Sequence, residues 1–123
     1  ASSAGLLPAG PYMATYYATK SYVTSLTRAV ALELKEKKSN VYVGALCPGP
    51  VDTEFNKVAN VEFAIPSITP TYCASYAIRK MEKRKIVIVP KNKMKVLALI
   101  SRVLPQSLVI RMTARQQKKK RSW

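Results

Sequence analysis

Two short apolar runs separated by helical segments constrain the fold of this chain more than any other feature. The runs "VYVGALC" (41–47) and "KIVIVP" (85–90) are rich in β-branched and aromatic or aliphatic residues, and both stop at a proline. Such runs are typical of buried strands, whereas apolar residues recur every three or four positions in the segments around them. The order helix, strand, helix, strand predicts an α/β fold with a parallel sheet.

The first two helices have recognisable boundaries in the sequence. One is predicted from residue 15 to about residue 38, and its apolar positions should form a buried stripe. The members of that stripe are Tyr22, Leu26, Ala29, Val30 and Leu34. Thr69 followed by Pro70 is typical of a helix start, which predicts a second helix from residue 70 to about residue 83. Between them, a short helix near residues 54–59 is expected.

Charge separates the chain into two parts, residues 1–90 and a basic amphipathic helical tail at 91–123. The formal net charge is +15, and thirteen of the 21 Lys and Arg residues lie from Lys83 onward, where no Asp or Glu occurs. Within the tail, "MKVLALISRVL" predicts an amphipathic helix, and a further helix is expected from Pro105. Its apolar face comprises Val96, Ile100, Val103 and Leu104. Such an end attracts polyanions, so one interpretation of the chain is a peripheral membrane or polyanion-binding module.

The composition also bears on redox state, metals and location. Cys47 and Cys73 lie in apolar or helix-like segments, and the chain contains no histidine, so both are predicted to be reduced core thiols and no metal site is expected. Residues 1–10 lack the pattern of a signal peptide, and charges interrupt the apolar stretch 94–110. We therefore expect a cytoplasmic protein, either soluble or membrane-associated.

Two Tyr-x-x-x-Lys pairs compete for a chemical role. Tyr16 and Lys20 in "YYATK" lie four residues apart, so on a helix they share a face, and the same holds for Tyr76 and Lys80 in "YAIRK". Only the first pair is accompanied by further candidate motifs. The segment "SSAG" precedes it, and "PGPVDT" follows the first predicted strand.

Residues 1 to about 90 resemble the second half of a short-chain dehydrogenase/reductase. The resemblance rests on the order of a serine, a Tyr-x-x-x-Lys pair and a Pro-Gly loop that follows a strand. The resemblance implies the C-terminal half of a doubly wound parallel-sheet, Rossmann-like fold. It also implies an NAD(P)-dependent oxidoreductase of the alcohol/carbonyl type. Tyr16 would exchange a proton with the substrate oxygen, and Ser2 would hydrogen-bond that oxygen. Free tyrosine holds its proton until about pH 10, and a positive charge one turn away favours the phenolate.

The same resemblance implies how the cofactor, NAD or NADP, is held. Lys20 would bind the nicotinamide ribose beside Tyr16. Pro48, Gly49 and Val51 would approach the nicotinamide ring, and Thr53 offers a hydroxyl beside it.

Some alternatives stay open on the sequence alone. Ser3 takes the place of Ser2 if the register is shifted by one residue. Tyr17 is excluded as the catalytic tyrosine because Ser21, rather than a lysine, stands four residues beyond it. Tyr76 and Lys80 are interpreted as ordinary helix residues.

Other features of the family are missing from this sequence. The four glycines, Gly5, Gly10, Gly44 and Gly49, do not form the glycine-rich loop that holds the cofactor pyrophosphate. We therefore expect this chain alone to be inactive. The resemblance also implies a homo-oligomer for the full-length form. The substrate is expected to be a small hydrophobic carbonyl or alcohol, with a lid at residues 57–70. No specific nucleic-acid partner is expected, because the basic residues are not interleaved with aromatic ones.

Overall fold

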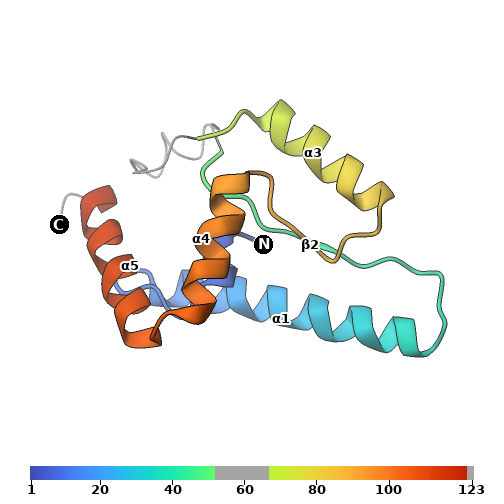
Figure 1. The fold of residues 1–123 in the computed structure, drawn as a ribbon, viewed down its shortest axis with the longest axis horizontal. Helices are drawn as coiled ribbons and strands as arrows, with labels where there is room; N and C mark the ends of the chain where they lie inside the picture. The colour runs from blue at the N-terminus through green and yellow to red at the C-terminus, as the bar shows by residue number, and fades with distance from the viewer. Residues whose placement is uncertain (52–66, 122–123) are drawn as a thin grey trace.

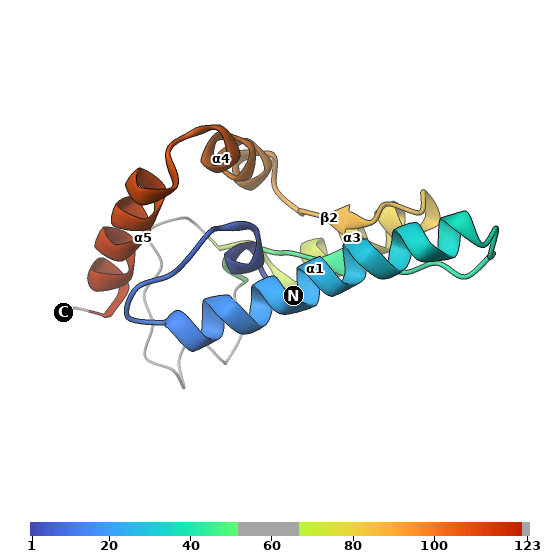
Figure 2. The ribbon, with the colours of Figure 1, turned by 90° about the horizontal axis from the view of Figure 1, so that it is seen from below.

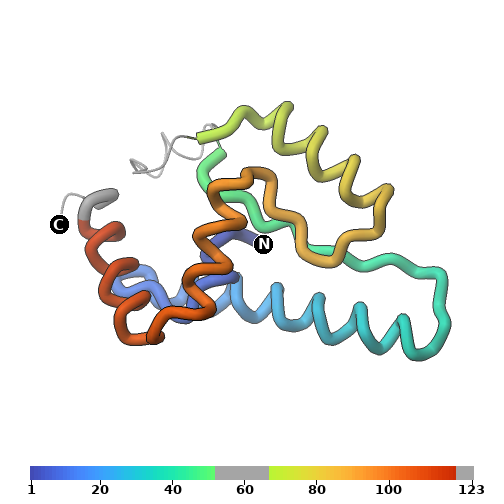
Figure 3. The backbone as a smooth tube through the Cα atoms, in the orientation of Figure 1, coloured from blue at the N-terminus to red at the C-terminus, as the bar shows by residue number. Residues whose placement is uncertain are grey.

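A computed structural model describes residues 1–51 and 67–121 of the chain, drawn as ribbon and tube in Figures 1 and 3. The predicted helix at 54–59 and the lid segment up to residue 66 lie outside these residues. The elements follow in the order η1 (Ser3–Leu6), α1 (Ala14–Glu36), β1 (Ala45–Leu46), α3 (Pro70–Glu82), β2 (Val87–Ile88), α4 (Asn92–Val103) and α5 (Gln106–Arg121).

The strands β1 and β2 form a parallel pair, as the order of elements predicts. Ala45 lies opposite Val87 and Leu46 opposite Ile88. The backbone N–H groups of Ala45 and Cys47 donate to the carbonyls of Ile86 and Ile88, each at 2.7 Å. Helix α1 covers one face of this pair and α3 the other, as both views show (Figures 1 and 2).

The observed strands are shorter than the apolar runs that predicted them. Apolar composition marks where a strand can form, but a strand is completed only where two backbones exchange hydrogen bonds. Here the exchange is confined to residues 45–47 and 86–88. The α/β fold with a parallel sheet is therefore confirmed, whereas a doubly wound sheet is supported only by the helices on its two faces.

Helix ends agree with the sequence to within two residues. The Thr69 side chain accepts a hydrogen bond from the backbone N–H of Tyr72 at 3.1 Å, and Pro70 is the first residue of α3. This is the expected cap, in which a hydroxyl satisfies one of the free N–H groups of the first turn. Lys38 and Arg84, just beyond α1 and α3, both adopt a positive φ and so reverse the chain toward the strands.

The predicted buried stripe on α1 is wrong, because Tyr22, Leu26 and Ala29 are exposed and Val30 and Leu34 are only half-buried. Tyr22 is 69% exposed and Leu26 is 50% exposed. The buried residues of α1 are Tyr17 and Thr24, seven positions apart and on the opposite face of a helix with 3.6 residues per turn. Thr24 is buried because η1 and the end of β1 pack on it. Tyr17 is buried because the first loop and α5 pack on it.

The hydrophobic core is small and centres on the strands. Ala45, Cys47 and Val89 are buried together, and Leu6, Val87 and Met94 pack against them. Both cysteines are buried and outside any disulfide, as predicted. No helix in the described part of the chain is both long and apolar enough to cross a membrane.

Candidate active site

The short helix η1, which the candidate serine Ser2 caps, packs directly on the candidate catalytic helix α1. A Cβ atom placed on Gly5 would lie 2.5 Å from Thr24 Oγ1 and 2.6 Å from the Lys20 carbonyl oxygen. Both distances are far below an ordinary contact, so only glycine fits between η1 and this turn of α1. The Thr24 hydroxyl donates to the same Lys20 carbonyl at 2.9 Å, which keeps it close to the helix.

The Pro-Gly loop joins the same assembly. The backbone N–H of Ser3 donates to the Pro48 carbonyl at 2.9 Å. One residue earlier, the Cys47 sulfur lies 4.0 Å from the Thr24 hydroxyl, which links β1 to α1. After α1 the chain turns back and returns through β1 toward the end of the molecule where α1 begins (Figure 3). The serine turn, formed by Ser2 and η1, therefore meets helix α1 and the Pro-Gly loop, as the sequence order suggests.

Tyr16 and Lys20 lie together on one flank of the buried face of α1. The Lys20 ammonium nitrogen is 5.4 Å from the centroid of the Tyr16 ring, and Tyr16 is 38% exposed. A cation at this distance is attracted to the ring and adds positive potential around it. The pair is thus accessible to a ligand, and its charge is close to the phenol.

Tyr17, by contrast, is a structural residue. It is only 6% exposed, and its hydroxyl accepts a hydrogen bond of 2.6 Å from Gln117 Nε2 of helix α5. Burial raises the pKa of Tyr17, although the bond from Gln117 works in the opposite direction. A Cβ on Gly10 would strike the Tyr17 ring, so the first loop also packs closely on it. These contacts give Tyr17 a structural role, whereas the adjacent Tyr16 stays accessible to a ligand.

The two serines differ in what their hydroxyls do. Ser2 caps η1, and its Oγ accepts a bond from the Ala4 N–H at 3.2 Å. Its own O–H hydrogen stays available for donation to a substrate oxygen. In the described residues the Ser3 hydroxyl has no hydrogen bond, so it too is available. Ser2 remains the predicted catalytic serine, with Ser3 as its alternative.

The Pro-Gly loop lies against the first turn of α4 at Gly49. Pro48, Gly49 and Val51 are half-buried, and Val51 forms an isolated parallel bridge with Ile68. A Cβ on Gly49 would meet only the Met94 side chain, at 3.1 Å from its Cγ. Hydroxyl, ammonium and backbone groups at this end fit a nicotinamide and its ribose chemically. Thr53, the remaining predicted cofactor residue, lies outside the described residues.

Tyr76 and Lys80 occupy a different part of the fold, on the opposite side of the strands from α1. The Lys95 ammonium donates to the Tyr76 hydroxyl, which is therefore engaged within the protein. The cationic groups of Lys80 and Arg79 lie 5.4 and 5.6 Å from the Tyr76 ring centroid. The candidate serines Ser2 and Ser3 lie at η1, which packs on α1, and Tyr76 keeps its interpretation as an ordinary helix residue.

Sequence reasoning missed the role of Gln117. This residue is 2% exposed, and its Oε1 is buried without a partner among the described residues. Its contact joins positions 100 residues apart, and no periodicity or motif signals such a pair. Metal ligands are a separate matter: within residues 1–51 and 67–121, no three His, Cys, Asp or Glu side chains come together.

Comparisons with known proteins bear on this arrangement. The sequence model of the short chain dehydrogenase family matches residues 1–62. A short-chain dehydrogenase from Sphingobium yanoikuyae, solved in complex with NADPH, is similar in structure, with a TM-score of 0.62 and 24% sequence identity. The similarity covers 86% of this chain and 44% of that protein, so the chain spans less than half of its neighbour's length. No match is found among curated proteins.

The family match covers the serine turn, the Tyr16–Lys20 helix and the Pro-Gly loop, which are the segments that converge in the structure. The structural neighbour agrees with the α/β fold. The chain belongs to the short-chain dehydrogenase family.

Proposed function

We propose that this chain carries the catalytic half of an NAD(P)-dependent oxidoreductase that interconverts a hydrophobic alcohol and its carbonyl compound. The observation that carries the proposal is the meeting of three segments: η1 lies on α1 at Gly5, and the Ser3 N–H binds the Pro48 carbonyl. Family membership supports the reaction class, and the NADPH of the structural neighbour supports the cofactor class. A complementary segment would supply the site for the cofactor phosphates.

Each residue has a distinct proposed task. Tyr16 donates a proton to the carbonyl oxygen during reduction and accepts it during oxidation. Lys20, whose ammonium group lies beside the Tyr16 ring, would bind the nicotinamide ribose. The Ser2 hydroxyl donates to the substrate oxygen and stabilises the charge that develops there. Pro48, Gly49, Val51 and Thr53 would hold the nicotinamide, which when bound exchanges a hydride with the substrate carbon.

Replacement of Tyr16 by Phe in the full-length enzyme tests the proposal. Turnover should fall by a factor of about 100 or more, because the proton donor is lost, while cofactor affinity should stay nearly unchanged. Tyr76→Phe is the matched control, since it removes the hydroxyl of the other Tyr-x-x-x-Lys pair. Normal turnover by Tyr16→Phe together with loss of turnover by Tyr76→Phe would show that the wrong pair has been chosen.

The serine assignment has its own test in the same enzyme. If Ser2 stabilises the substrate oxygen, Ser2→Ala should lower kcat more than Ser3→Ala does. The reverse order would assign the role to Ser3. Stability measurements accompany both variants, because Ser2→Ala also removes the cap of η1.

A second candidate function, membrane association, is favoured by the surface of α4. Val96 is 54% exposed and Val103 is 76% exposed, with Ile100 between them on the same stripe. Lys93 lies on the same helix, and α5 adds further basic residues. An apolar stripe flanked by cations binds anionic bilayers through apolar burial and charge together. We propose that this face contacts anionic lipid, in addition to the enzymatic role.

Vesicle sedimentation measures this association. Binding to anionic vesicles should survive moderate salt in part, and should be lost when Val96, Ile100 and Val103 are changed to Ser, which keeps every charge. Ile78→Ser with Met81→Ser is the matched control, because these α3 residues are comparably exposed. Unchanged binding by the α4 variant, or full competition by duplex DNA at physiological salt, would leave only a nonspecific cationic surface.

A further inference from the structure

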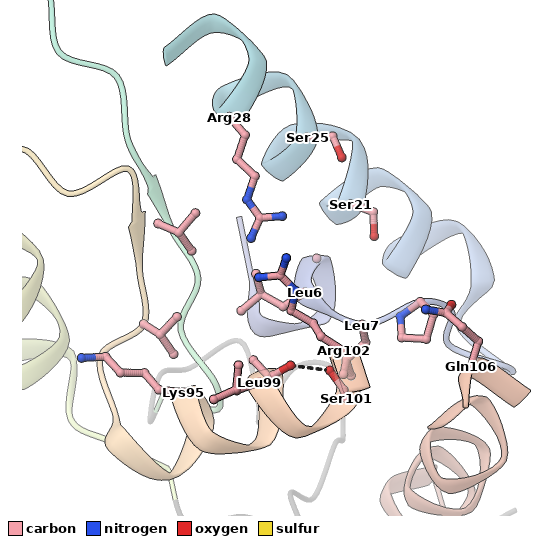
Figure 4. A pocket seen from close by; sticks show the side chains of 15 residues that line it. Leu6, Leu7, Ser21, Ser25, Arg28, Lys95, Leu99, Ser101, Arg102 and Gln106 are labelled. Carbon is pink, nitrogen blue, oxygen red and sulfur yellow. Dashed lines mark hydrogen bonds between the residues drawn. The ribbon is translucent and has the colours of Figure 1, made fainter. Parts of the chain in front are cut away.

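A pocket with an apolar floor lies between η1, the loop after it, α1, β2 and α4 (Figure 4). Its volume is ≈ 530 Å³, which is within the range of small-ligand sites. Leu6, Leu7, Val87, Val89 and Leu99 supply apolar surface. The pocket thus offers a place for an apolar ligand body, next to polar groups from two helices.

Two arginines meet in this pocket. Arg28 reaches into it from α1 and Arg102 from α4, with their guanidinium groups directed toward one another (Figure 4). Within the described part of the chain, neither arginine forms an ion pair, and the residues that line the pocket include no Asp or Glu. The two positive charges repel each other when they are held close together. An anion bound between them is attracted to both, and this attraction offsets their repulsion.

Hydroxyl groups extend the same polar wall. Ser21 and Ser25 precede Arg28 on α1 by seven and three residues, so all three share one side of the helix, and Figure 4 shows them along the pocket. Lys95 also lines the pocket, but its ammonium group binds the Tyr76 hydroxyl instead. The free donors are therefore the two guanidinium groups and the two serine hydroxyls.

This pocket is separate from the candidate active site. Arg28 lies twelve residues beyond Tyr16 along α1, or about 18 Å at the rise of an α-helix. Tyr16 and Lys20 lie on one flank of the face formed by Tyr17 and Thr24, and Arg28 lies on the other. A ligand between Arg28 and Arg102 would therefore not contact the catalytic tyrosine.

We propose that this pocket binds a phosphate monoester with an apolar body. Guanidinium groups from two different helices suit a tetrahedral dianion, whose oxygens accept hydrogen bonds from several directions. A carboxylate is satisfied by one guanidinium in a planar, bidentate contact and would leave the second arginine unpaired. The apolar body lies on Leu6, Leu99 and the residues of β2, and the serine hydroxyls donate to the remaining phosphate oxygens.

Calorimetry on the full-length protein tests the site with defined probes. Decyl phosphate, below its micelle concentration, should bind more tightly than inorganic phosphate, because only the former fills the apolar floor. It should also bind more tightly than decanoate, which has the apolar body without the phosphate. Equal affinity for decyl phosphate and decanoate would refute the preference for phosphate. Equal affinity for decyl phosphate and inorganic phosphate would refute the proposal that an apolar body binds the pocket floor.

Arginine variants locate the binding. Arg28→Gln and Arg102→Gln should each weaken decyl phosphate binding by about tenfold or more, the usual effect of losing hydrogen bonds to a charged group. Arg111→Gln, an exposed arginine of α5, removes the same charge elsewhere and should change binding less than twofold. Equal effects of all three variants overturn the site, as does displacement of the probe by saturating NADP, which would assign the phosphate to the cofactor site.

Vesicles containing phosphatidic acid then distinguish a lipid head group from a soluble ester. Sedimentation that depends on Arg28 and Arg102 supports a lipid head group as the source of the phosphate. Sedimentation independent of both arginines, with decyl phosphate still bound through them, supports a soluble ester. The melting temperature of each variant without ligand serves as the check that the fold is retained.

Discussion

Replacement of Gly5 by Ala should damage both stability and turnover, because η1 and α1 are in contact at this residue. The added Cβ would lie 2.5 Å from Thr24 Oγ1, whereas ordinary contacts begin at 3.4 Å, so the two segments must separate by roughly 0.9 Å. The nearest backbone atom, the Lys20 carbonyl oxygen at 2.6 Å, cannot move out of the way without distorting α1. No glycine of the described chain has a positive φ, so the cause is space rather than backbone conformation.

The expected magnitudes follow from that separation. Overpacking of this kind costs about 1 to 3 kcal/mol of unfolding free energy. A displacement near 1 Å between catalytic groups lowers rates by about 100-fold, and here the serine turn would move relative to Tyr16. Urea unfolding of the full-length protein measures the first effect, and kcat/KM for alcohol oxidation measures the second.

Gly49→Ala is the matched control for stability. Its Cβ would meet the Met94 side chain at 3.1 Å, and a flexible methionine can shift by a few tenths of an ångström. We expect a cost below about 1 kcal/mol for this variant. If Gly5→Ala changes the unfolding free energy by less than Gly49→Ala does and retains full turnover, the close packing of η1 on α1 is not what positions the serine.

Two further predictions concern buried groups. Burial raises the pKa of the Cys47 thiol, so the unfolded chain releases this proton first as the pH rises above about 8.5. The stabilisation from Cys47 is therefore complete below that pH and is lost as the pH rises through the folded-state pKa. Cys47→Ala should therefore make the unfolding free energy decline less steeply between pH 8 and 10. An unchanged slope would contradict this prediction. Tyr17→Phe should cost about 1 to 3 kcal/mol because it leaves the buried Gln117 side chain without its partner. Tyr17→Phe with Gln117→Leu should recover much of that loss in chemical denaturation, whereas strictly additive effects would show that the two side chains are not coupled.

The sequence predicts those parts of the fold that depend on local physics. The start of α3 follows from Thr69 and Pro70, because a cap and a proline act within one turn. The order of elements predicts the parallel pairing of β1 and β2. In the candidate site, the segments that carry Tyr16, Lys20 and the Pro-Gly loop are brought together as their order along the chain suggests.

The remaining features depend on contacts between distant segments. Apolar spacing on α1 singles out Tyr22 and Leu26, but spacing alone does not tell which side of a helix the rest of the chain will cover. Thr24 is buried because η1 approaches it at Gly5, and a small polar residue carries no apolar signal. Ser2 and Ser3 likewise differ through the cap of η1, a feature of three-dimensional geometry rather than of residue type.

The hydrogen bond between Gln117 and Tyr17 has a consequence for the order of events during synthesis. Helix α1 can form once its own residues have left the ribosome, but the polar end of Tyr17 gains its partner only after 100 more residues have been made. Until then, the turn that carries the candidate catalytic tyrosine lacks one of its lateral supports. Maturation of the active site should therefore coincide with the docking of α5, and a chain that stops before Gln117 would hold every proposed catalytic residue and still lack a finished site.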